Sequence, residues 1–441
     1  MNFINIDFKE NEAKYISIYK HIKNLIIQGM VKEHEKLPSR RILQGELGLS
    51  PNTINNAYNL LLEEGYIYSI EKSGYYISPY KNYQNKEIIE KEEMINETYK
   101  YDFTSESIDH SLFPYYTLKK ITQDIMLNNE KIWLSKSPYQ GDNELRKTIA
   151  RYLFENKGMK VSASNIVIVS SLEESLEIIS TLFSIKKVAL EDPLYKKVYS
   201  FFKEKNLSIK LCSIDKEGIV LPKEKDIDLL YVTPYNQFPL GIKMSNDRRK
   251  ALLSFPSKYI FEDDFDCDLI SSNKFMSTLY SLNNEKIIYH GSFSHTFCPG
   301  IRISYLVLPS SLISHYNEKY SKSSSRISSL DQAILSRFIQ EGYYNRHIGK
   351  LKKSLNKKKE IISSYLKEHQ IPFQETELSF ILYTNKDTKI LKKHLLDASI
   401  KIHFIGDFCI NKSDNRLILS YISIDENILI EGLDILKNIL I

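Results

Sequence analysis

The sequence predicts a chain of two parts: a small, mostly helical N-terminal domain and a large α/β domain with a mostly parallel sheet. Three observations predict this. The first eighty residues show helical hydrophobic spacing, helix-capping residues and a short hairpin pattern. Beyond residue 100, apolar β-rich runs alternate with helical stretches, as in parallel sheets covered by helices. A charged segment without Gly or Pro separates the two patterns.

The first two helices are predicted from their apolar faces and their ends. Residues 17–28 carry apolar side chains at helical spacing, and Gly29 follows as a stop. In the second helix, Ser39 is a suitable N-cap, and Gly48 suits the left-handed residue that follows a helix end. A third helix follows this pair directly.

The third helix is the most clearly marked of the three. Ser50 is its expected cap, Pro51 fits the first helical position, and Gly65 closes it. Asparagine is a poor helix former, yet the face opposite the apolar one is rich in it. Asparagine amides pair with adenine edges or phosphates, although a genome that favours Asn codons is an alternative explanation. The polar face consists of Asn52, Thr53, Asn55, Asn56 and Asn59.

Two short strands, 66–70 and 75–78, complete this part of the chain. Three helices and a hairpin in this order describe a winged helix-turn-helix, which binds double-stranded DNA. Nine Lys and Arg balance nine Asp and Glu through Tyr80, so any positive face must be local. The candidates for that face are Lys36, Arg40, Arg41 and Lys72.

Several short motifs cover nearly all of residues 15–78: Leu37-Pro38-Ser39-Arg40-Arg41, Leu49-Ser50-Pro51-Asn52-Thr53-Ile54, Ala57-Tyr58, Glu64-Gly65-Tyr66 and Gly74-Tyr75-Tyr76. Together they resemble the GntR family of bacterial regulators. The resemblance implies that Arg41, the start of the third helix and the wing contact operator DNA. Pro51 departs from the pattern, because many members carry an arginine there. The expected DNA-binding residues are Arg40, Arg41, Ser50, Asn52, Thr53, Asn55, Lys72, Ser73 and Gly74.

A charged linker, 81–100, is expected between a DNA-binding domain at 1–80 and a large domain at 101–441. The segment has nine charged residues and few core-forming positions. In the large domain, ligands are expected at the carboxyl ends of the strands, because open α/β sheets bind there. The predicted strands are 165–169, 187–190, 209–214, 229–232, 259–261, 286–289 and 303–308.

The large domain carries a second set of motifs, which covers nearly all of the remaining chain. They are Phe113-Pro114, Leu145-Arg146, Glu191-Asp192-Pro193, Thr233-Pro234, Gln237-Phe238-Pro239, Glu262-Asp263-Asp264-Phe265-Asp266, the loop 291–302, Gly342-Tyr343-Tyr344-Asn345-Arg346-His347 and Asn415-Arg416-Leu417. They resemble a class I aminotransferase domain of fold type I, of the kind fused to GntR heads in the MocR group. The resemblance implies a homodimer built on the aminotransferase interface, and pyridoxal phosphate as the family cofactor.

Much of the expected cofactor pocket is retained. The resemblance places Asp263 beside the pyridinium nitrogen, Tyr195 against the ring, and Ser294 and Arg302 on the phosphate. It also implies that Arg416 binds the substrate carboxylate, so an amino acid or another carboxylate is an expected effector. An ordinary salt bridge or core position is the alternative for each of these residues.

Three features of the family pocket are lost. His295 stands where the family has its Schiff-base lysine, and an imidazole cannot condense with an aldehyde. Phe265 replaces a tyrosine whose hydroxyl would bond the cofactor ring. The expected Ser-Gly-Ala-Gln-Gln at a helix start reads Ser-Ser-Leu-Glu-Glu, which brings Glu173 to a phosphate site. Asn236, where histidine is usual, is a milder change. Covalent cofactor binding is therefore predicted to be absent, while noncovalent binding stays possible.

These residues favour a DNA-binding transcription regulator over an enzyme. The alternatives are a noncovalent pyridoxal or pyridoxamine phosphate sensor, a residual aminotransferase-class enzyme, or a dimer whose large domain is only a clamp. A net charge of +5 over 441 residues implies no nucleic acid by itself. Four scattered cysteines show no metal-ligand spacing. With no signal-peptide pattern and no apolar run of about 20 residues, a cytoplasmic protein without a membrane segment is expected.

Overall fold

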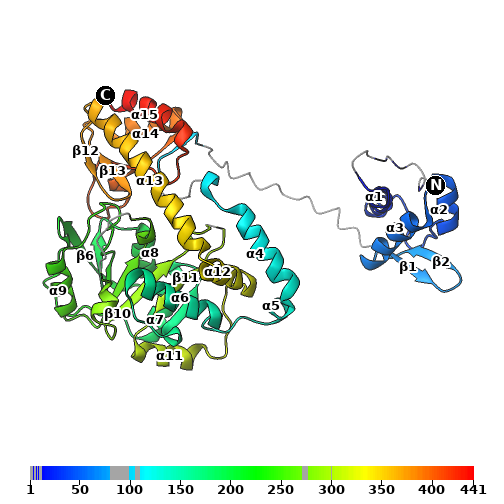
Figure 1. Cartoon of the computed structure of the whole chain (residues 1–441), viewed down its shortest axis with the longest axis horizontal. Coiled ribbons are helices and arrows are strands. Elements are labelled where there is room, and N and C mark those ends of the chain that lie inside the picture. The colour runs from blue at the N-terminus through cyan, green and yellow to red at the C-terminus, as the bar shows by residue number, and fades with distance from the viewer. Residues whose placement is uncertain are drawn as a thin grey trace. The chain divides into compact units, whose positions relative to one another are not determined.

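A computed structural model of the chain describes residues 3, 6, 8, 12–79, 99–104, 110–270, 277–298 and 300–441. The chain divides into two compact units, Met1–Asn96 and Glu97–Ile441 (Figure 1). The expected linker lies outside the described residues except for positions 99 and 100, so its limits stay a prediction. Within the described ranges, no helix has the length and apolar content needed to cross a membrane.

The smaller unit is the predicted winged helix-turn-helix. The side chain of Ser39 accepts a hydrogen bond from the N–H of Ile42, and that of Ser50 accepts one from the N–H of Thr53. Both predicted caps are therefore confirmed. Its elements are α1 (Lys14–Ile27), α2 (Arg40–Leu47), α3 (Pro51–Glu63), β1 (Ile67–Ile70) and β2 (Gly74–Ile77).

The wing is tied to the segment before α2 by backbone hydrogen bonds. The N–H of His34 donates to the carbonyl of Ile77, and that of Leu37 donates to Tyr75, both at 2.9 Å. Beneath it, one apolar core joins the three helices to the hairpin, with Ile22, Leu43 and Ile54 fully buried. The packing therefore holds the exposed faces of α2, α3 and the wing in one rigid frame.

The larger unit is built on an eight-stranded sheet in the order β4-β11-β10-β9-β8-β5-β6-β7. Its strands from β6 through β5, β8 and β9 to β10 pair in parallel, whereas β11 is antiparallel to both β10 and β4. The prediction of a mostly parallel sheet is confirmed. The strands are β4 (Ile166–Val169), β5 (Lys187–Asp192), β6 (Ser208–Asp215), β7 (Gly218–Ile219), β8 (Leu229–Val232), β9 (Tyr259–Asp264), β10 (Ile287–Ser292) and β11 (Ser304–Val307).

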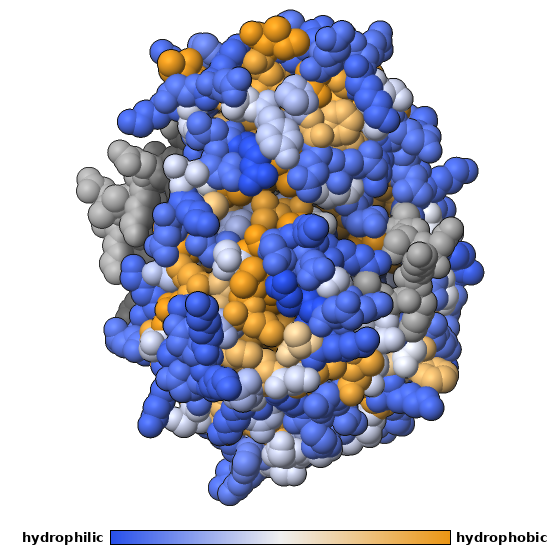
Figure 2. Space-filling view, turned by 90° about the vertical axis from the view of Figure 1, so that its left-hand side faces the viewer, coloured by the Kyte–Doolittle hydropathy of each residue, from blue (hydrophilic) through white to orange (hydrophobic). Residues whose placement is uncertain are grey.

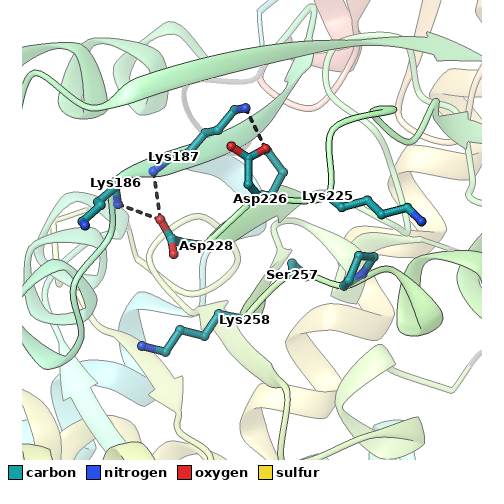
Figure 3. A pocket seen from close by; sticks show the side chains of 9 residues that line it. Lys186, Lys187, Lys225, Asp226, Asp228, Ser257 and Lys258 are labelled. Carbon is teal, nitrogen blue, oxygen red and sulfur yellow. Dashed lines mark hydrogen bonds and ion pairs between the residues drawn. The ribbon is translucent and has the colours of Figure 1, made fainter.

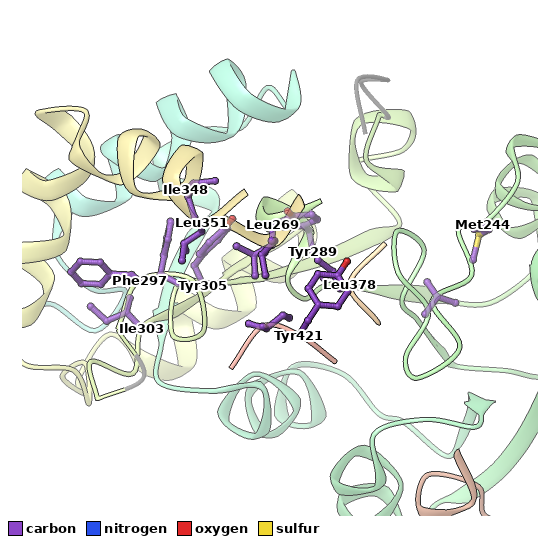
Figure 4. Packing of buried hydrophobic residues seen from close by; sticks show 14 of the residues in the cluster. Met244, Leu269, Tyr289, Phe297, Ile303, Tyr305, Ile348, Leu351, Leu378 and Tyr421 are labelled. Atoms are coloured by element: carbon purple, nitrogen blue, oxygen red, sulfur yellow. The ribbon is translucent and has the colours of Figure 1, made fainter. Parts of the chain in front are cut away.

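Alternate residues of these strands enter two different apolar cores. In β4, Val167 and Val169 belong to the core shared with α7, α8 and α11, whereas Ile166 and Ile168 belong to the core shared with α6, α12 and α13. Figure 4 shows part of the second core, around Tyr289, Tyr305 and Leu351. A sheet buried on both faces reads as continuous apolar runs, which is why these strands were predictable. The helices are α4 (Tyr115–Asn128), α5 (Glu130–Leu134), α6 (Asn143–Lys157), α7 (Leu172–Leu182), α8 (Lys196–Glu204), α9 (Asn246–Ser254), α10 (Leu279–Leu282), α11 (Ser310–Tyr320), α12 (Ser329–Gln340) and α13 (Tyr343–Glu368).

A smaller sheet and two helices form the C-terminal part of this unit (Figure 1). Its antiparallel order is β12-β13-β16-β15, and a separate pair joins β3 to β14. On the face shown in Figure 2 the surface is mostly hydrophilic, and apolar residues gather in a central band. The elements are β3 (Tyr101–Asp102), β12 (Phe373–Glu375), β13 (Ser379–Leu382), α14 (Thr388–Asp397), β14 (Ile400–Lys401), β15 (His403–Phe404), β16 (Leu417–Ser420) and α15 (Glu426–Leu440); one-turn helices span His110–Leu112, Ala163–Asn165, Cys267–Leu269 and Ile405–Asp407.

Candidate nucleic-acid interface and ligand pocket

The N-terminal end of α3 presents the polar side chains that were predicted to meet DNA. Asn52 is exposed, and Thr53 and Asn55 are half-buried beside it. The hydroxyls of Ser50 and Thr53 lie 2.9 Å apart, so Ser50 serves both as helix cap and as part of this surface. Pro51 has no N–H and the N–H of Thr53 is bonded to Ser50, so the N–H of Asn52 is the one that the first turn offers to a phosphate oxygen.

The two neighbouring arginines of α2 differ in their surroundings. Arg41 is exposed, whereas the guanidinium of Arg40 lies over the ring of Tyr75 at 4.7 Å and donates to Asn59 at 3.5 Å. Arg40 thereby ties α2 to α3 and the wing. The DNA contacts expected of both arginines stay a prediction; the geometry adds a packing role for Arg40 and leaves Arg41 exposed.

The wing turn depends on two residues with positive φ. Lys72 has φ of 61° and Gly74 has φ of 121°. A residue with a side chain would be strained at the φ of Gly74, so glycine is needed there. Between them, the hydroxyl of Ser73 lies 2.5 Å from that of Tyr76. Lys72 is exposed at the tip, so its ammonium is a second available cation of the head.

In the larger unit, the predicted pocket residues follow the carboxyl ends of parallel strands. Tyr195 follows β5, Asn236 follows β8, Phe265 follows β9 and His295 follows β10. Because these strands run in the same direction, their following loops meet at one edge of the sheet. Arg302 comes just before the antiparallel β11 and so reaches the same edge.

Asp263 is buried and engaged on both carboxylate oxygens. The in-register pairing of β9 with β10 sets it opposite His290, whose Nδ1 lies 2.8 Å from Oδ1. The hydroxyl of Tyr231 donates to Oδ2. Burial and the nearby Asp263 raise the pKa of Tyr231 well above its ordinary value, so this hydroxyl keeps its proton. Neither His290 nor Tyr231 was predicted, because only the strand register shows that they meet Asp263.

His295 is held by a carboxylate that the sequence motif contained but did not assign. Its Nδ1 lies 2.7 Å from Oδ1 of Asp266, a residue with φ of 59°, and its ring stacks on Phe265 at 5.4 Å. The upstream Lys286 does not replace the missing lysine. It precedes β10 rather than lying in it as predicted, and its ammonium donates to the carbonyls of Leu253 and Phe255.

Only glycine fits at position 291 of the loop motif, for a steric reason. A Cβ at this position would lie 2.4 Å from the ring of Tyr305, because that ring packs across β10. Beyond it, the hydroxyl of Ser304 donates to that of Ser292 at 2.9 Å, and Ser294 donates to the carbonyl of Ile303 at 3.4 Å. Ser294, expected on a phosphate, is thus bonded within its own loop.

Arg416, the expected carboxylate ligand, is paired inside the chain. Its Nε and Nη2 donate to both carboxylate oxygens of Asp414, at 2.6 to 3.1 Å. Burial alone would raise the pKa of Asp414, but the guanidinium outweighs burial and lowers it. A carboxylate effector would have to compete with Asp414 for this guanidinium.

The Glu191 and Thr233 motifs have a structural role. The Thr233 hydroxyl donates to the buried Glu191 carboxylate at 2.6 Å, and the amide of Gln237 donates to the same oxygen at 3.4 Å. Burial raises the pKa of Glu191 to about 7. In the loop between Thr233 and Gln237, the side-chain oxygen of Asn236 is buried without a hydrogen-bond partner.

These residues do not fit a phosphorylated cofactor held as a Schiff base. His295 offers no amine, Phe265 offers no hydroxyl, and the first turn of α7 carries two carboxylates, Glu173 and Glu174. Tyr195 and Arg302 keep their expected places at the strand ends. Across the described ranges, no cluster of His, Cys, Asp and Glu could hold a metal ion.

A separate hollow of about 500 Å³ lies at the opposite, amino edge of the sheet (Figure 3). Lys187 and Asp226 form an ion pair there at 2.9 Å, and Asp228 accepts from the backbone N–H groups of Lys186 and Lys187. The hollow contains none of the predicted pocket residues.

Comparison with known proteins agrees with both units. A model of bacterial regulatory proteins of the gntR family matches residues 14–77, and one of aminotransferase class I and II matches 113–406. The chain is 30% identical over 361 residues to the uncharacterized HTH-type transcriptional regulator YdeL of Bacillus subtilis, covering 79% of this chain and 78% of that protein. It is 24% identical to the HTH-type pyridoxine biosynthesis transcriptional regulator PdxR of Corynebacterium glutamicum, covering 93% and 92%.

Solved structures show the same fold in the larger unit. An archaeal alanine:glyoxylate aminotransferase superposes with a TM-score of 0.69 at 19% identity, covering 77% of this chain and 90% of the other. The Pyrococcus horikoshii kynurenine aminotransferase superposes with a TM-score of 0.67 at 20% identity, covering 78% and 91%.

The head, the sheet and these matches define a class of protein, the helix-turn-helix transcription regulators. The chain belongs to the family in which a gntR-type head is fused to an aminotransferase class I and II domain.

The contacts of Arg40 lead to a prediction about the stability of the head. We expect Arg40→Ala to speed hydrogen exchange of α3 and wing amides about fivefold, because a cation–π contact and a hydrogen bond are lost. Hydrogen–deuterium exchange on the full chain measures this. Arg41→Ala is the control and should leave protection unchanged; equal effects of the two variants would contradict the packing role of Arg40.

Proposed function

We propose that this transcription regulator binds operator DNA through α3, Arg41 and the wing, and that it acts without covalent cofactor chemistry. The observation that carries the second part is His295, an imidazole bonded to Asp266 where the family has an amine. An imidazole can exchange protons, but it cannot form the Schiff base on which aminotransferase chemistry depends. We therefore propose that the larger unit has no aminotransferase activity.

DNA binding is supported by the arrangement of the head. Helix α3 exposes Asn52 at its N-terminal end, and the exposed cations Arg41 and Lys72 are available for phosphates. Phosphate contacts position such a head, and amide contacts to base edges give it sequence preference. A regulator of this kind works where the chromosome is, so we propose a cytoplasmic location.

We propose a homodimer formed by the larger unit, with one head for each half-site. The apolar surface of α4 and α5 supports this. Tyr116 is 81% exposed, Leu127 is 79% exposed and Leu134 is 87% exposed. Tyr116 and Leu127 are three helical turns apart and so share a face of α4. Such a face is typical of stable subunit interfaces, which bury apolar side chains.

Noncovalent cofactor sensing is the alternative, and the pocket disfavours it. Phe265 gives the ring no hydroxyl, Ser294 is bonded within its loop, and Arg416 is already paired with Asp414. Of the groups expected to hold the cofactor phosphate or the substrate carboxylate, Arg302 keeps its place, whereas Ser294 and Arg416 are engaged within the chain. An effector of different chemistry stays compatible with this domain.

The exposed Arg41 gives a test of the DNA interface. We expect Arg41→Ala to weaken operator binding and to reduce the slope of log affinity against log salt by about one per head, as loss of one phosphate contact should. Fluorescence anisotropy at several salt concentrations measures both. Lys20→Ala, which removes a charge on α1 that pairs with Glu12, is the control. An unchanged slope for Arg41→Ala would remove this residue from the interface.

The His295 geometry gives a test of cofactor chemistry. When the native protein is mixed with equimolar pyridoxal phosphate and reduced with borohydride, we expect no covalent adduct on Lys197 or on residues 286–302. Peptide mass spectrometry measures this, and a lysine-dependent aminotransferase treated identically is the positive control. The loop 291–302 contains no lysine, so an adduct at Lys286, or at Lys197 beside Tyr195, would overturn the proposed loss of covalent chemistry.

The apolar face of α4 gives a test of the homodimer. We expect Leu127→Glu to weaken self-association about a hundredfold, because it places an unpaired charge in an apolar interface in both copies. Sedimentation equilibrium measures the dissociation constant. Ile390→Glu on α14 is the control, since Ile390 is also exposed, at 56%. If both variants dimerise like the native chain, α4 is not the interface.

A further inference from the structure

The N-terminal end of α7 lies where an aminotransferase domain would be expected to hold a phosphate. The helix begins at Leu172, directly after β4, and so opens at the carboxyl edge of the sheet. The first N–H groups of a helix lack intrahelical partners, and the helix dipole adds positive potential there. An anion is therefore expected at this point, and the chain itself supplies two.

The Glu174 carboxylate accepts the hydrogen bonds of Ser170, which precedes the helix. One of its carboxylate oxygens accepts from both the backbone N–H and the hydroxyl of Ser170, each at 2.7 Å. Its other oxygen lies 3.5 Å from Nε of Arg326. With a side chain only 13% exposed, Glu174 is a fixed cap.

Glu173 is the carboxylate that faces the pocket cations. It lies 3.6 Å from the ammonium of Lys197. Burial alone would raise its pKa, but hydrogen bonds from its own backbone N–H and from the Ser171 hydroxyl, with the charges of Lys197 and Arg302, lower it. Glu173 is therefore an anion at neutral pH, and it interacts with the groups that would meet a phosphate.

Both cations lie near the predicted pocket residues, and the ion pair is partly exposed: the side chain of Lys197 is 63% exposed and that of Glu173 is 42% exposed. Lys197 comes two residues after Tyr195, and its ammonium lies 5.6 Å from the centre of that ring. Arg302 closes the loop that carries His295. The Glu173 carboxylate therefore interacts with the helix that follows Tyr195 and with the charge of Arg302.

We propose that the Glu173 carboxylate takes the place of a ligand phosphate, so that this pocket excludes phosphorylated ligands and needs none to balance Lys197 and Arg302. The proposal uses the pocket placement of the proposed function but not the loss of Schiff-base chemistry. A phosphate dianion brought to the same helix end would be repelled by the Glu173 carboxylate a few ångströms away. Such repulsion is worth more than a factor of ten in affinity at a partly buried site.

The first experiment compares the binding of inorganic phosphate by the native protein, Glu173→Gln and Glu177→Gln. Glu177 is a matched control, because it lies one turn further along α7 and pairs with Lys205 at 2.8 Å. Isothermal titration should show phosphate binding at least about tenfold tighter in Glu173→Gln than in the other two proteins. Glu173→Ala, which removes the whole carboxylate arm, should show the same gain. Equal affinity in all proteins, or no binding in any of them, would overturn the proposal.

A second experiment separates this proposal from the proposed function. His295→Lys restores an amine, and His295→Lys with Glu173→Gln also removes the internal anion. We expect the double variant to form a reducible adduct at a pyridoxal phosphate concentration at least about tenfold lower than the single variant needs. With pyridoxal, which lacks the phosphate, the two variants should react equally. If the two variants need the same pyridoxal phosphate concentration, Glu173 is not the phosphate substitute, although the loss of covalent chemistry would still stand.

Discussion

The parallel pairing of β9 with β10 is the constraint on which the larger unit depends. This register places Asp263 opposite His290 and lets the two strands end together at one edge of the sheet. Because both faces of the sheet are covered by apolar cores, polar side chains can gather only where the strands end. The position of the pocket is thus a consequence of the layered packing, and it does not depend on which side chains line the pocket.

Charge balance inside this pocket comes from side chains of the chain itself. Asp266 pairs with His295, Asp414 pairs with Arg416, and Glu173 faces Lys197. Buried or partly buried charges are costly unless they are paired, so the charged side chains of this pocket are stabilised by partners within the chain. The carboxylates of the chain supply those partners.

Each of the two units has its own buried apolar residues and its own set of polar side chains. The head has a small core that holds α2, α3 and the wing in one frame, with Arg40 linking them through Tyr75. The larger unit has the fold of aminotransferases, with His295 where a lysine is expected from the family motif. Fold alone does not determine function, so the proposed loss of activity rests on the identity of a few pocket side chains.

The sequence by itself determined the order and type of the elements in the head and of most strands in the large sheet, and it predicted the loss of the lysine. Helix caps such as Ser39 and Ser50 act locally, and buried strands appear as apolar runs, so both can be recognised from the sequence. Motif matches also located His295, Phe265 and Glu173. Partners far apart in sequence were decided only by the tertiary structure. His290 meets Asp263 through strand register, and Lys197 meets Glu173 through helix packing. Arg40 and Arg41 are adjacent and chemically identical, yet only the fold turns one onto Tyr75 and leaves the other exposed.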